Sequence, residues 1–277
     1  MTWSGCGGTP AGTKSRPSTS SISGLARAGF HVLDAVLAVT LAPACAACHR
    51  VLDSPLGGPV CEHCWDGVRP LVGPICRTCG VPIATRGVAS AQDESCAACH
   101  RRPSAVDWGR VAADYSGSLR DIIHAFKYEG RQSLAGPLSR VLAEAGASVL
   151  AGADGVVAVP LHPWKRLRRG FNQAAELAGG LGPPVVPALW RVRATRAQVG
   201  LAAATRRRNV RDAFVPSPLL GFQLRERAVA NRVMVLVDDV RTTGATLHEC
   251  ARVLKQMGAR EVRSLALAQA PARESRA

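Results

Sequence analysis

NRVMVLVDDVRTTGATL, residues 231–247, is the stretch of sequence that decides the fold. Val233 to Val237 is a short apolar run rich in β-branched residues, which predicts a strand buried on both faces of a parallel sheet. We expect this strand to end at Asp238–Asp239, where small hydroxyl-bearing residues lead into a helix from about Leu247 to Met257. A helix N-terminus after a tight turn offers unpaired N–H groups to an anion, and carboxylates suit vicinal hydroxyls. The stretch therefore predicts a site for a phosphate that lies beside a sugar diol.

This order of residues resembles the 5-phosphoribosyl 1-pyrophosphate (PRPP) signature of type I phosphoribosyltransferases. The resemblance implies that Asp238 and Asp239 hold the ribose hydroxyls and that the following loop holds the 5-phosphate. The loop residues are Thr242, Thr243, Gly244, Ala245 and Thr246. The chain contains neither GxxxxGK[ST] nor GxGxxG, so the other common phosphate-binding loops lack support. An ordinary strand and loop with surface acids is the alternative.

Strand and helix patterns alternate on the N-terminal side of this stretch, and one more strand follows it. Strands are predicted at 110–115, 156–159 and 262–267, and helices at 119–126, 134–149 and 171–181. Such alternation predicts an α/β fold, a mostly parallel sheet with helices on both faces and its ligand at the carboxyl ends of the strands. We assign residues 107–277 to this phosphoribosyltransferase-like domain.

Four CxxC pairs precede this domain. They are Cys45/Cys48, Cys61/Cys64, Cys76/Cys79 and Cys96/Cys99. Two such hairpins complete a four-cysteine zinc site, and the 12 residues between Cys48 and Cys61 and the 16 between Cys79 and Cys96 suit zinc ribbons. Sequential pairing, first with second and third with fourth, predicts two structural zinc ions. Cross-braced pairing, a single occupied site and a disulfide framework are the alternatives.

The module has few large apolar residues, so we expect zinc to supply much of its folding free energy. Zinc removal is then expected to unfold residues 45–99 and to spare the later sheet.

The N-terminal region divides into a tail and a helix. Residues 1–24 are rich in Gly, Ser, Thr and Pro and are expected to be disordered. Residues 22–42 are apolar with three polar interruptions, which favours an amphipathic helix over a membrane span. We therefore group residues 25–106 as this helix plus the double zinc-ribbon module. A signal peptide ending near Ala44 is the alternative. Zinc-type cysteine spacing favours a cytoplasmic protein without membrane insertion.

The charge of the chain is strongly basic, with 35 Lys plus Arg against 20 Asp plus Glu. The segment from Leu161 to Asp212 has eleven basic and two acidic residues, and so carries +9 of the formal +15. This balance favours anionic partners such as phosphorylated substrates or nucleic acid. With only two Tyr and five Phe, no platform for stacking single-stranded bases is evident from composition.

Further motifs make the resemblance closer than fold class. The CxxC pairs are followed in order by HAFKYEG (124–130), VPLH (159–162), RRGFNQA (168–174), QVGL (198–201) and VDDVRTTGATL (237–247). Together they are similar to the ComF family of competence-associated phosphoribosyltransferase-like proteins, over roughly residues 30–270. The resemblance implies binding of magnesium with PRPP, and a link to natural transformation and imported single-stranded DNA.

The resemblance also adds residues to the candidate site. It places the loop from Leu161 through His162 to Trp164 against the pyrophosphate, and it includes Arg169, Asn172 and Gln173 in a substrate-side loop. Lys127, one of only four lysines, is a further candidate.

Two functions follow from these observations. The first is a phosphoribosyltransferase that passes ribose phosphate from PRPP to an acceptor nitrogen, although no general base or base-recognition pocket is evident. The second is a non-enzymatic single-stranded-DNA-handling factor, which uses residues 161–211 on the DNA backbone and has a regulatory or vestigial PRPP site. A zinc module that recruits the DNA-import machinery is compatible with either.

Overall fold

The computed structural model describes residues 42–83, 95–193, 210–219, 221 and 227–271. The expected N-terminal tail, the QVGL motif and all but the last residue of the helix expected at 22–42 lie outside these residues. Within the described part of the chain, no helix is both long enough and apolar enough to cross a bilayer.

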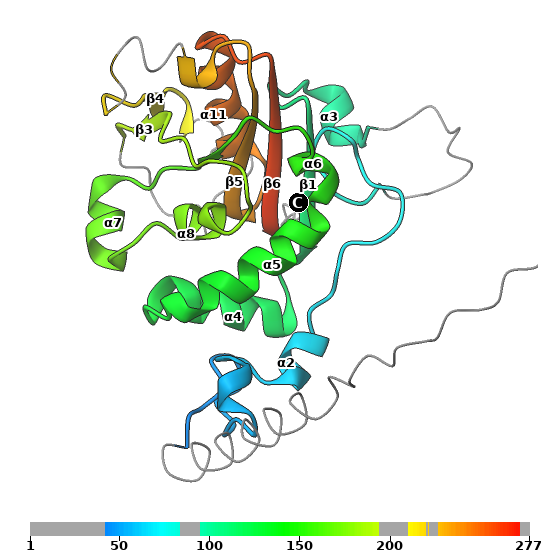
Figure 1. The fold of residues 1–277 in the computed structure, drawn as a ribbon. Helices are drawn as coiled ribbons and strands as arrows, with labels where there is room; N and C mark the ends of the chain where they lie inside the picture. The colour runs from blue at the N-terminus through cyan, green and yellow to red at the C-terminus, as the bar shows by residue number, and fades with distance from the viewer. Residues whose placement is uncertain (1–41, 84–94, 194–209, 220, 222–226, 272–277) are drawn as a thin grey trace, which may run out of the picture.

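Four parallel strands form the central sheet, in the order β1-β6-β5-β2 (Figure 1). Their bounds are β1 (Trp108–Asp114), β2 (Gly155–Ala158), β5 (Val233–Arg241) and β6 (Glu261–Gln269). In the register of the central pairs, Val235 lies opposite Arg263 and Val157 lies opposite Leu236. Because every pair is parallel, the carboxyl ends of all four strands meet at one edge.

Helices cover both faces of this sheet. Against one face lie α4 (Gly117–Tyr128), the short 3-10 turn η2 (Gln132–Leu134), α5 (Ala135–Ala145), α6 (Ala147–Leu150) and α8 (Gln173–Gly179). Against the other lie α11 (Ala245–Gln256) and an antiparallel pair, β3 (Leu189–Arg191) and β4 (Phe214–Pro216).

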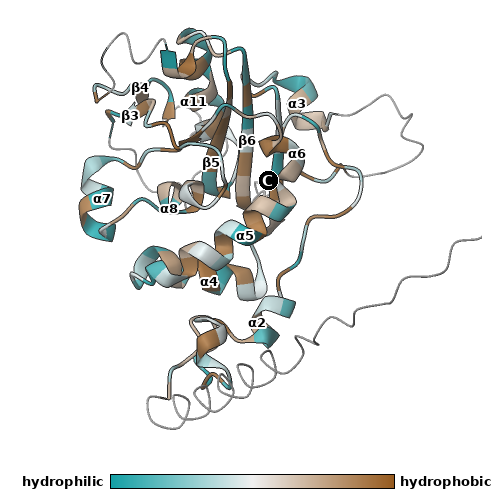
Figure 2. Ribbon diagram, viewed as in Figure 1, coloured by the Kyte–Doolittle hydropathy of each residue, from teal (hydrophilic) through white to brown (hydrophobic). Residues whose placement is uncertain are grey.

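Alternate residues of β5 pack into two hydrophobic cores, one on each face of the sheet. Val235 and Val237 pack with α4, α5 and α8, while Met234 and Leu236 pack with α11. The hydropathy colouring shows the apolar character of the central strands (Figure 2). The prediction of a parallel-sheet strand buried on both faces is therefore confirmed.

The central strand is longer than its apolar run. It continues to Arg241, which pairs with Gln269 of β6, so the acidic pair lies within the strand rather than after it. Gly244 has a φ of 75°, and α11 begins at the next residue, earlier than predicted.

A short helix occupies part of the stretch 160–173, where the resemblance implies loops. This helix, α7 (Pro163–Arg169), has Pro163 at its first position and ends at Gly170, whose φ is 79°. His162 caps its start, accepting from the Trp164 N–H at 3.4 Å. Proline is favoured at the first position of a helix, and glycine is favoured just past its last residue.

The cysteine-rich module consists of η1 (Pro55–Gly57), α2 (Glu62–Asp66), α3 (Ala97–Arg101) and the loops around them. Its first half packs below α4, near the bottom of Figure 1. The segment 69–71 between its halves pairs antiparallel with the outer edge of β1. The Leu71 N–H donates to the Ala112 carbonyl at 3.1 Å, and the Asp114 N–H donates to the Arg69 carbonyl at 3.0 Å. The segment between the two halves of the module is thus attached to the edge strand β1.

Candidate functional site

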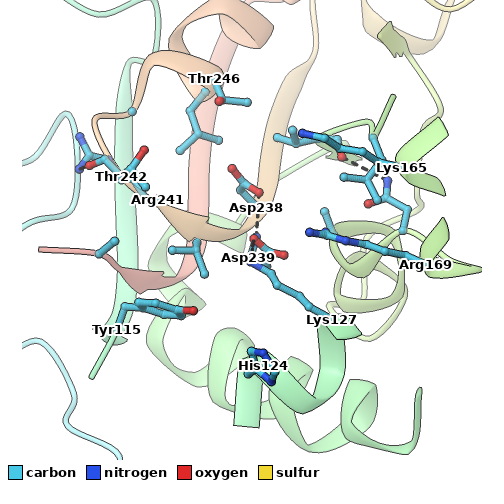
Figure 3. A pocket seen from close by; sticks show the side chains of 18 of the residues that line it. Tyr115, His124, Lys127, Lys165, Arg169, Asp238, Asp239, Arg241, Thr242 and Thr246 are labelled. Atoms are coloured by element: carbon cyan, nitrogen blue, oxygen red, sulfur yellow. Dashed lines mark hydrogen bonds and ion pairs between the residues drawn. The ribbon is translucent and has the colours of Figure 1, made fainter. Parts of the chain in front are cut away.

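A cavity of about 830 Å³ opens at the carboxyl edge of the sheet (Figure 3). Each strand end contributes to its wall: Tyr115 follows β1, Leu161 follows β2, Asp238 and Asp239 lie near the end of β5, and Ala270 follows β6. Helices α4, α7, α8 and α11 and strand β3 supply the remaining sides. This is the edge at which open α/β sheets bind their ligands.

The acidic pair lies at the centre of the cavity. Lys127 reaches it from α4, with its Nζ 2.9 Å from Asp239 Oδ1, and these two side chains are only 12% and 13% exposed. Burial, together with the neighbouring Asp239 carboxylate, raises the pKa of Asp238 to about 7, against the opposing effect of Lys127. The cavity centre is therefore acidic but partly neutralised, which suits hydrogen bonding to hydroxyl groups.

The side chains of Arg241 and Gln269 hold the turn after β5 in position. A Cβ on Gly244 would lie 2.8 Å from Arg241 Nη2, so the absent side chain leaves room for the guanidinium. Arg241 Nη1 donates to Gln269 Oε1 at 2.6 Å, and Gln269 Nε2 donates to the Thr242 carbonyl at 3.0 Å. The turn that leads to the N-terminus of α11 is thereby fixed in position.

A cationic wall faces the acidic pair from α7 and β3. It consists of Lys165, Arg169 and Arg191. Burial lowers the pKa of Lys165, and the positive charges of Arg191 and Arg169 lower it further. The Arg169 guanidinium lies 5.1 Å from the ring centroid of Tyr128, so it links α7 to α4. The cavity can therefore accept an anionic group on this wall and hydroxyls on the acidic pair.

Most of the residues predicted for the site line this cavity. They are Lys127, Leu161, Arg169, Asn172, Asp238, Asp239, Thr242, Gly244 and Thr246. Asn172 also donates to the Val159 carbonyl at 3.1 Å, which ties the start of α8 to the loop after β2.

Four other predicted residues do not line the cavity but lie next to residues that do. Gln173 is buried and accepts from Arg169 Nη1 at 3.0 Å, and His162 caps α7. The Thr243 hydroxyl accepts from the Ala245 N–H at 3.5 Å, inside the turn.

Several lining residues were absent from the predicted site. They are Tyr115, Arg120, His124, Tyr128, Lys165, Arg191 and Arg241. Arg120, His124 and Tyr128 follow each other at i, i+4 spacing with Lys127 on the same helix face, so helical periodicity around Lys127 was the signal that would have found them. Arg191 comes from a three-residue strand that has no comparable signal.

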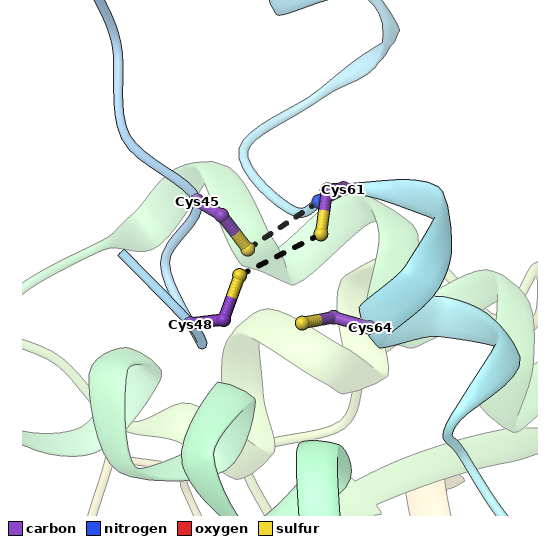
Figure 4. Close-up of side chains that lie close together, drawn as sticks. All are labelled: Cys45, Cys48, Cys61 and Cys64. Atoms are coloured by element: carbon purple, nitrogen blue, oxygen red, sulfur yellow. Dashed lines mark hydrogen bonds between the residues drawn. The ribbon is translucent and has the colours of Figure 1, made fainter. Parts of the chain in front are cut away.

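The eight cysteines form two separate clusters. Cys45, Cys48, Cys61 and Cys64 make the first, and their sulfurs point to a common centre (Figure 4). Cys76, Cys79, Cys96 and Cys99 make the second. The ligand atoms of each group lie within 4.8 Å of one another. Sequential pairing is confirmed and cross-braced pairing is wrong.

The cluster geometry fits zinc. The Cys48–Cys61 and Cys79–Cys96 sulfur pairs are each 3.7 Å apart. A tetrahedron with Zn–S bonds of about 2.3 Å has sulfurs about 3.8 Å apart. Backbone N–H groups also donate to Cys45 Sγ and Cys76 Sγ, as suits thiolates. None of the described cysteines forms a disulfide, so the disulfide alternative is wrong for these residues.

Comparison with known proteins finds a matching family for the cysteine-rich module and another for the sheet domain. The double zinc ribbon domain matches residues 36–100, and the phosphoribosyl transferase domain matches residues 167–277. The DNA utilization protein YhgH of Escherichia coli K12 is 35% identical over 196 residues, which are 66% of this chain and 79% of the relative. YhgH of Salmonella typhimurium is 32% identical over 216 residues, 73% of this chain and 87% of the relative. Competence protein F of Haemophilus influenzae is 29% identical over 187 residues, 64% and 79% respectively.

Proposed function

This chain belongs to the ComF family and has a type I phosphoribosyltransferase fold behind a double zinc ribbon; we propose that its cavity binds PRPP with magnesium and transfers ribose 5-phosphate to an acceptor nitrogen. One observation carries the proposal: the carboxylates of Asp238 and Asp239 lie between the N-terminal turn of α11 and the cationic wall of α7. Such a cavity complements a sugar diol with an anionic group on either side.

Each part of PRPP has a place in this arrangement. The ribose hydroxyls donate to Asp238 and Asp239, and the 5-phosphate lies at the α11 N-terminus, where Thr242 and Thr246 line the cavity. The pyrophosphate lies toward Lys165 and Arg169. Lys127 forms an ion pair with Asp239 in the described structure. When PRPP binds, Lys127 exchanges part of this contact for a contact with an anionic group of PRPP.

The proposed transfer breaks the bond between C1 of the ribose and the pyrophosphate oxygen, and the electron pair leaves with the pyrophosphate. The acceptor nitrogen forms the new bond to C1 and gives up a proton to solvent. Magnesium bound with PRPP beside the carboxylates of Asp238 and Asp239 would supply positive charge that favours departure of the pyrophosphate. The protein contributes by positioning PRPP and by placing the cations of Lys165 and Arg169 beside the leaving group.

The names of the relatives support a role in DNA handling. Two are named for DNA utilization and one for competence, and we extend that association to this chain, with single-stranded DNA and the DNA-import machinery as partners. Eight thiols arranged for zinc suit a reducing compartment, so we place the protein in the cytoplasm.

Calorimetric titration of magnesium PRPP into zinc-loaded protein tests the binding step. We expect saturable binding of one PRPP per chain. Replacing both acids, Asp238→Asn with Asp239→Asn, should weaken binding about a hundredfold or more, because charge-assisted hydrogen bonds to the diol are lost. Glu144→Gln is the matched control, since Glu144 is an exposed acid on α5 outside the cavity.

An unchanged PRPP affinity in the folded double variant would remove the diol role. If the parent protein gives no PRPP heat at several temperatures but binds DNA, the non-enzymatic DNA-handling function replaces the transferase.

A further inference from the structure

Helix α7 has a cationic face turned into the cavity. Lys165 and Arg169 are one helical turn apart and both line it. Figure 3 shows them on the wall opposite Tyr115. Burial lowers the pKa of Lys165, and Arg169 is held by Tyr128 and Gln173. This inward face belongs to the candidate PRPP site.

The other face of α7 is apolar and basic, and it is exposed. Trp164 is 71% exposed and Leu167, one turn further on, is 76% exposed. Arg168 lies one helical turn after Trp164, and Arg166 lies on the flank of the helix between Leu167 and the cavity-facing side; both are exposed. Neither apolar side chain lines the cavity or belongs to a core cluster of the described residues. Their exposure therefore calls for a role other than packing within this part of the fold.

The chemistry of this outer face selects its ligand. An indole ring offers a flat surface for a nucleobase, and neighbouring guanidinium groups attract phosphates and can also stack on bases. The sequence of α7, PWKRLRR, contains four cations and no acid, and it lies in the segment that carries most of the positive charge of the chain. A second copy of the same surface would bring like charges together, which opposes self-association through α7.

We propose that the outer face of α7 binds single-stranded nucleic acid, with a base stacked on Trp164 and backbone phosphates on Arg166 and Arg168. Because the same helix lines the cavity with its other face, the bound strand lies at the cavity mouth. Bases in a duplex are paired and stacked on each other, so this mode favours single strands. The inference gives a location to the DNA association proposed above, on which it rests, and it does not depend on PRPP binding.

Fluorescence anisotropy with a labelled oligo(dT) 20-mer tests the stacking contact in the zinc-loaded full chain. We expect Trp164→Ala to weaken binding about tenfold, since loss of one base–aromatic stack has an effect of this order. Val72→Ala is the matched control, because Val72 is 77% exposed and lies between the two zinc ribbons. It should leave the affinity unchanged.

The salt dependence of the same binding tests the phosphate contacts. Removing one contact with Arg166→Ser should reduce the slope of log K against log salt concentration by about 0.7. Arg140→Ser, at an exposed arginine on α5, should leave the slope as it is in the parent.

Three results would overturn the proposal: no binding of oligo(dT) by the parent, a Trp164→Ala effect no larger than that of Val72→Ala, or equal binding of a duplex of the same length. A dimer seen by sedimentation in the parent and lost in Trp164→Ala would assign the face to a second copy instead. Titration of magnesium PRPP into the same variants shows separately whether the transferase proposal holds.

Discussion

The two cysteine clusters have the same ligands but are attached to the fold in different ways. Cys45 and Cys64 of the first cluster are buried in one continuous core with Ile122 and Phe126 of α4. No residue of the second cluster belongs to either core of the described residues. That cluster instead meets β1 through the backbone, where the Gly109 N–H donates to the Arg77 carbonyl at 2.8 Å.

The first zinc ribbon is therefore part of the hydrophobic core, whereas the second is attached to the edge strand β1 through backbone contacts. We call this second attachment the clip. Helix α4 also carries Lys127, which reaches the acidic pair in the cavity. The first cluster is therefore coupled to the candidate site through α4. We had expected zinc loss to spare the sheet domain, and the shared core changes this expectation for the first cluster.

Removing one ligand from each cluster should give the largest contrast. Cys64→Ser and Cys99→Ser should each lower the zinc content from two ions to one, measured by mass spectrometry of the metal. Cys64→Ser should lower the midpoint of the main thermal transition by about 10 °C, because core packing around α4 is lost together with the metal. Cys99→Ser should lower it by less than about 4 °C. Equal shifts would contradict the distinction between core and clip.

A core substitution without loss of a zinc ligand sharpens the comparison. Leu52 is 4% exposed and belongs to the core shared with α4. Leu52→Ala should reduce the free energy of unfolding in urea by about 3 kcal/mol, which is typical of a large-to-small change in a core. Val72→Ala, at an exposed position, should change it by less than about 0.5 kcal/mol. A loss below about 1 kcal/mol for Leu52→Ala would show that the first ribbon contributes little to the core.

The clip depends on the close approach of Gly80 to β1. Of the three comparisons between a variant and its control, the one at this glycine should give the smallest difference in stability. Gly80 has a φ of 70°, and a Cβ there would lie 2.5 Å from the Cα of Arg110 in β1. Gly73 has a φ of 99° with nothing within 4 Å of a Cβ, so Gly73→Ala measures backbone strain alone. Gly80→Ala should destabilise by about 2 kcal/mol more than Gly73→Ala in urea unfolding, because it adds a steric clash. Equal effects would mean that the second ribbon does not press on β1.

Short sequence patterns were sufficient to predict the elements that depend only on neighbouring residues. The apolar run at 233–237 identified the central strand, and the CxxC spacing identified both cysteine clusters. The extension of β5 to Arg241 was missed because it depends on pairing with β6, a distant segment.

The misses at the candidate site have the same origin. Arg241 meets Gln269, 28 residues further along the chain, and nothing near either residue indicates that contact. The antiparallel β3–β4 pair that supplies Arg191 has only three residues in each strand, too few for a periodic pattern. Helix α7 was missed for a different reason, because proline and glycine are common in loops, whereas Pro163 and Gly170 mark the two ends of this helix.

The short pairing of residues 69–71 with β1 has a further consequence for association between chains. β1 is one of the two edge strands of the sheet, and an open strand edge is a template for pairing with another molecule. Pro70, which has no N–H group, lies opposite Ala113 and occupies this edge. We expect a fragment reduced to residues 107–277 to leave this edge uncovered and prone to strand-to-strand aggregation, because residues 69–71 of the cysteine-rich module occupy it in the full chain.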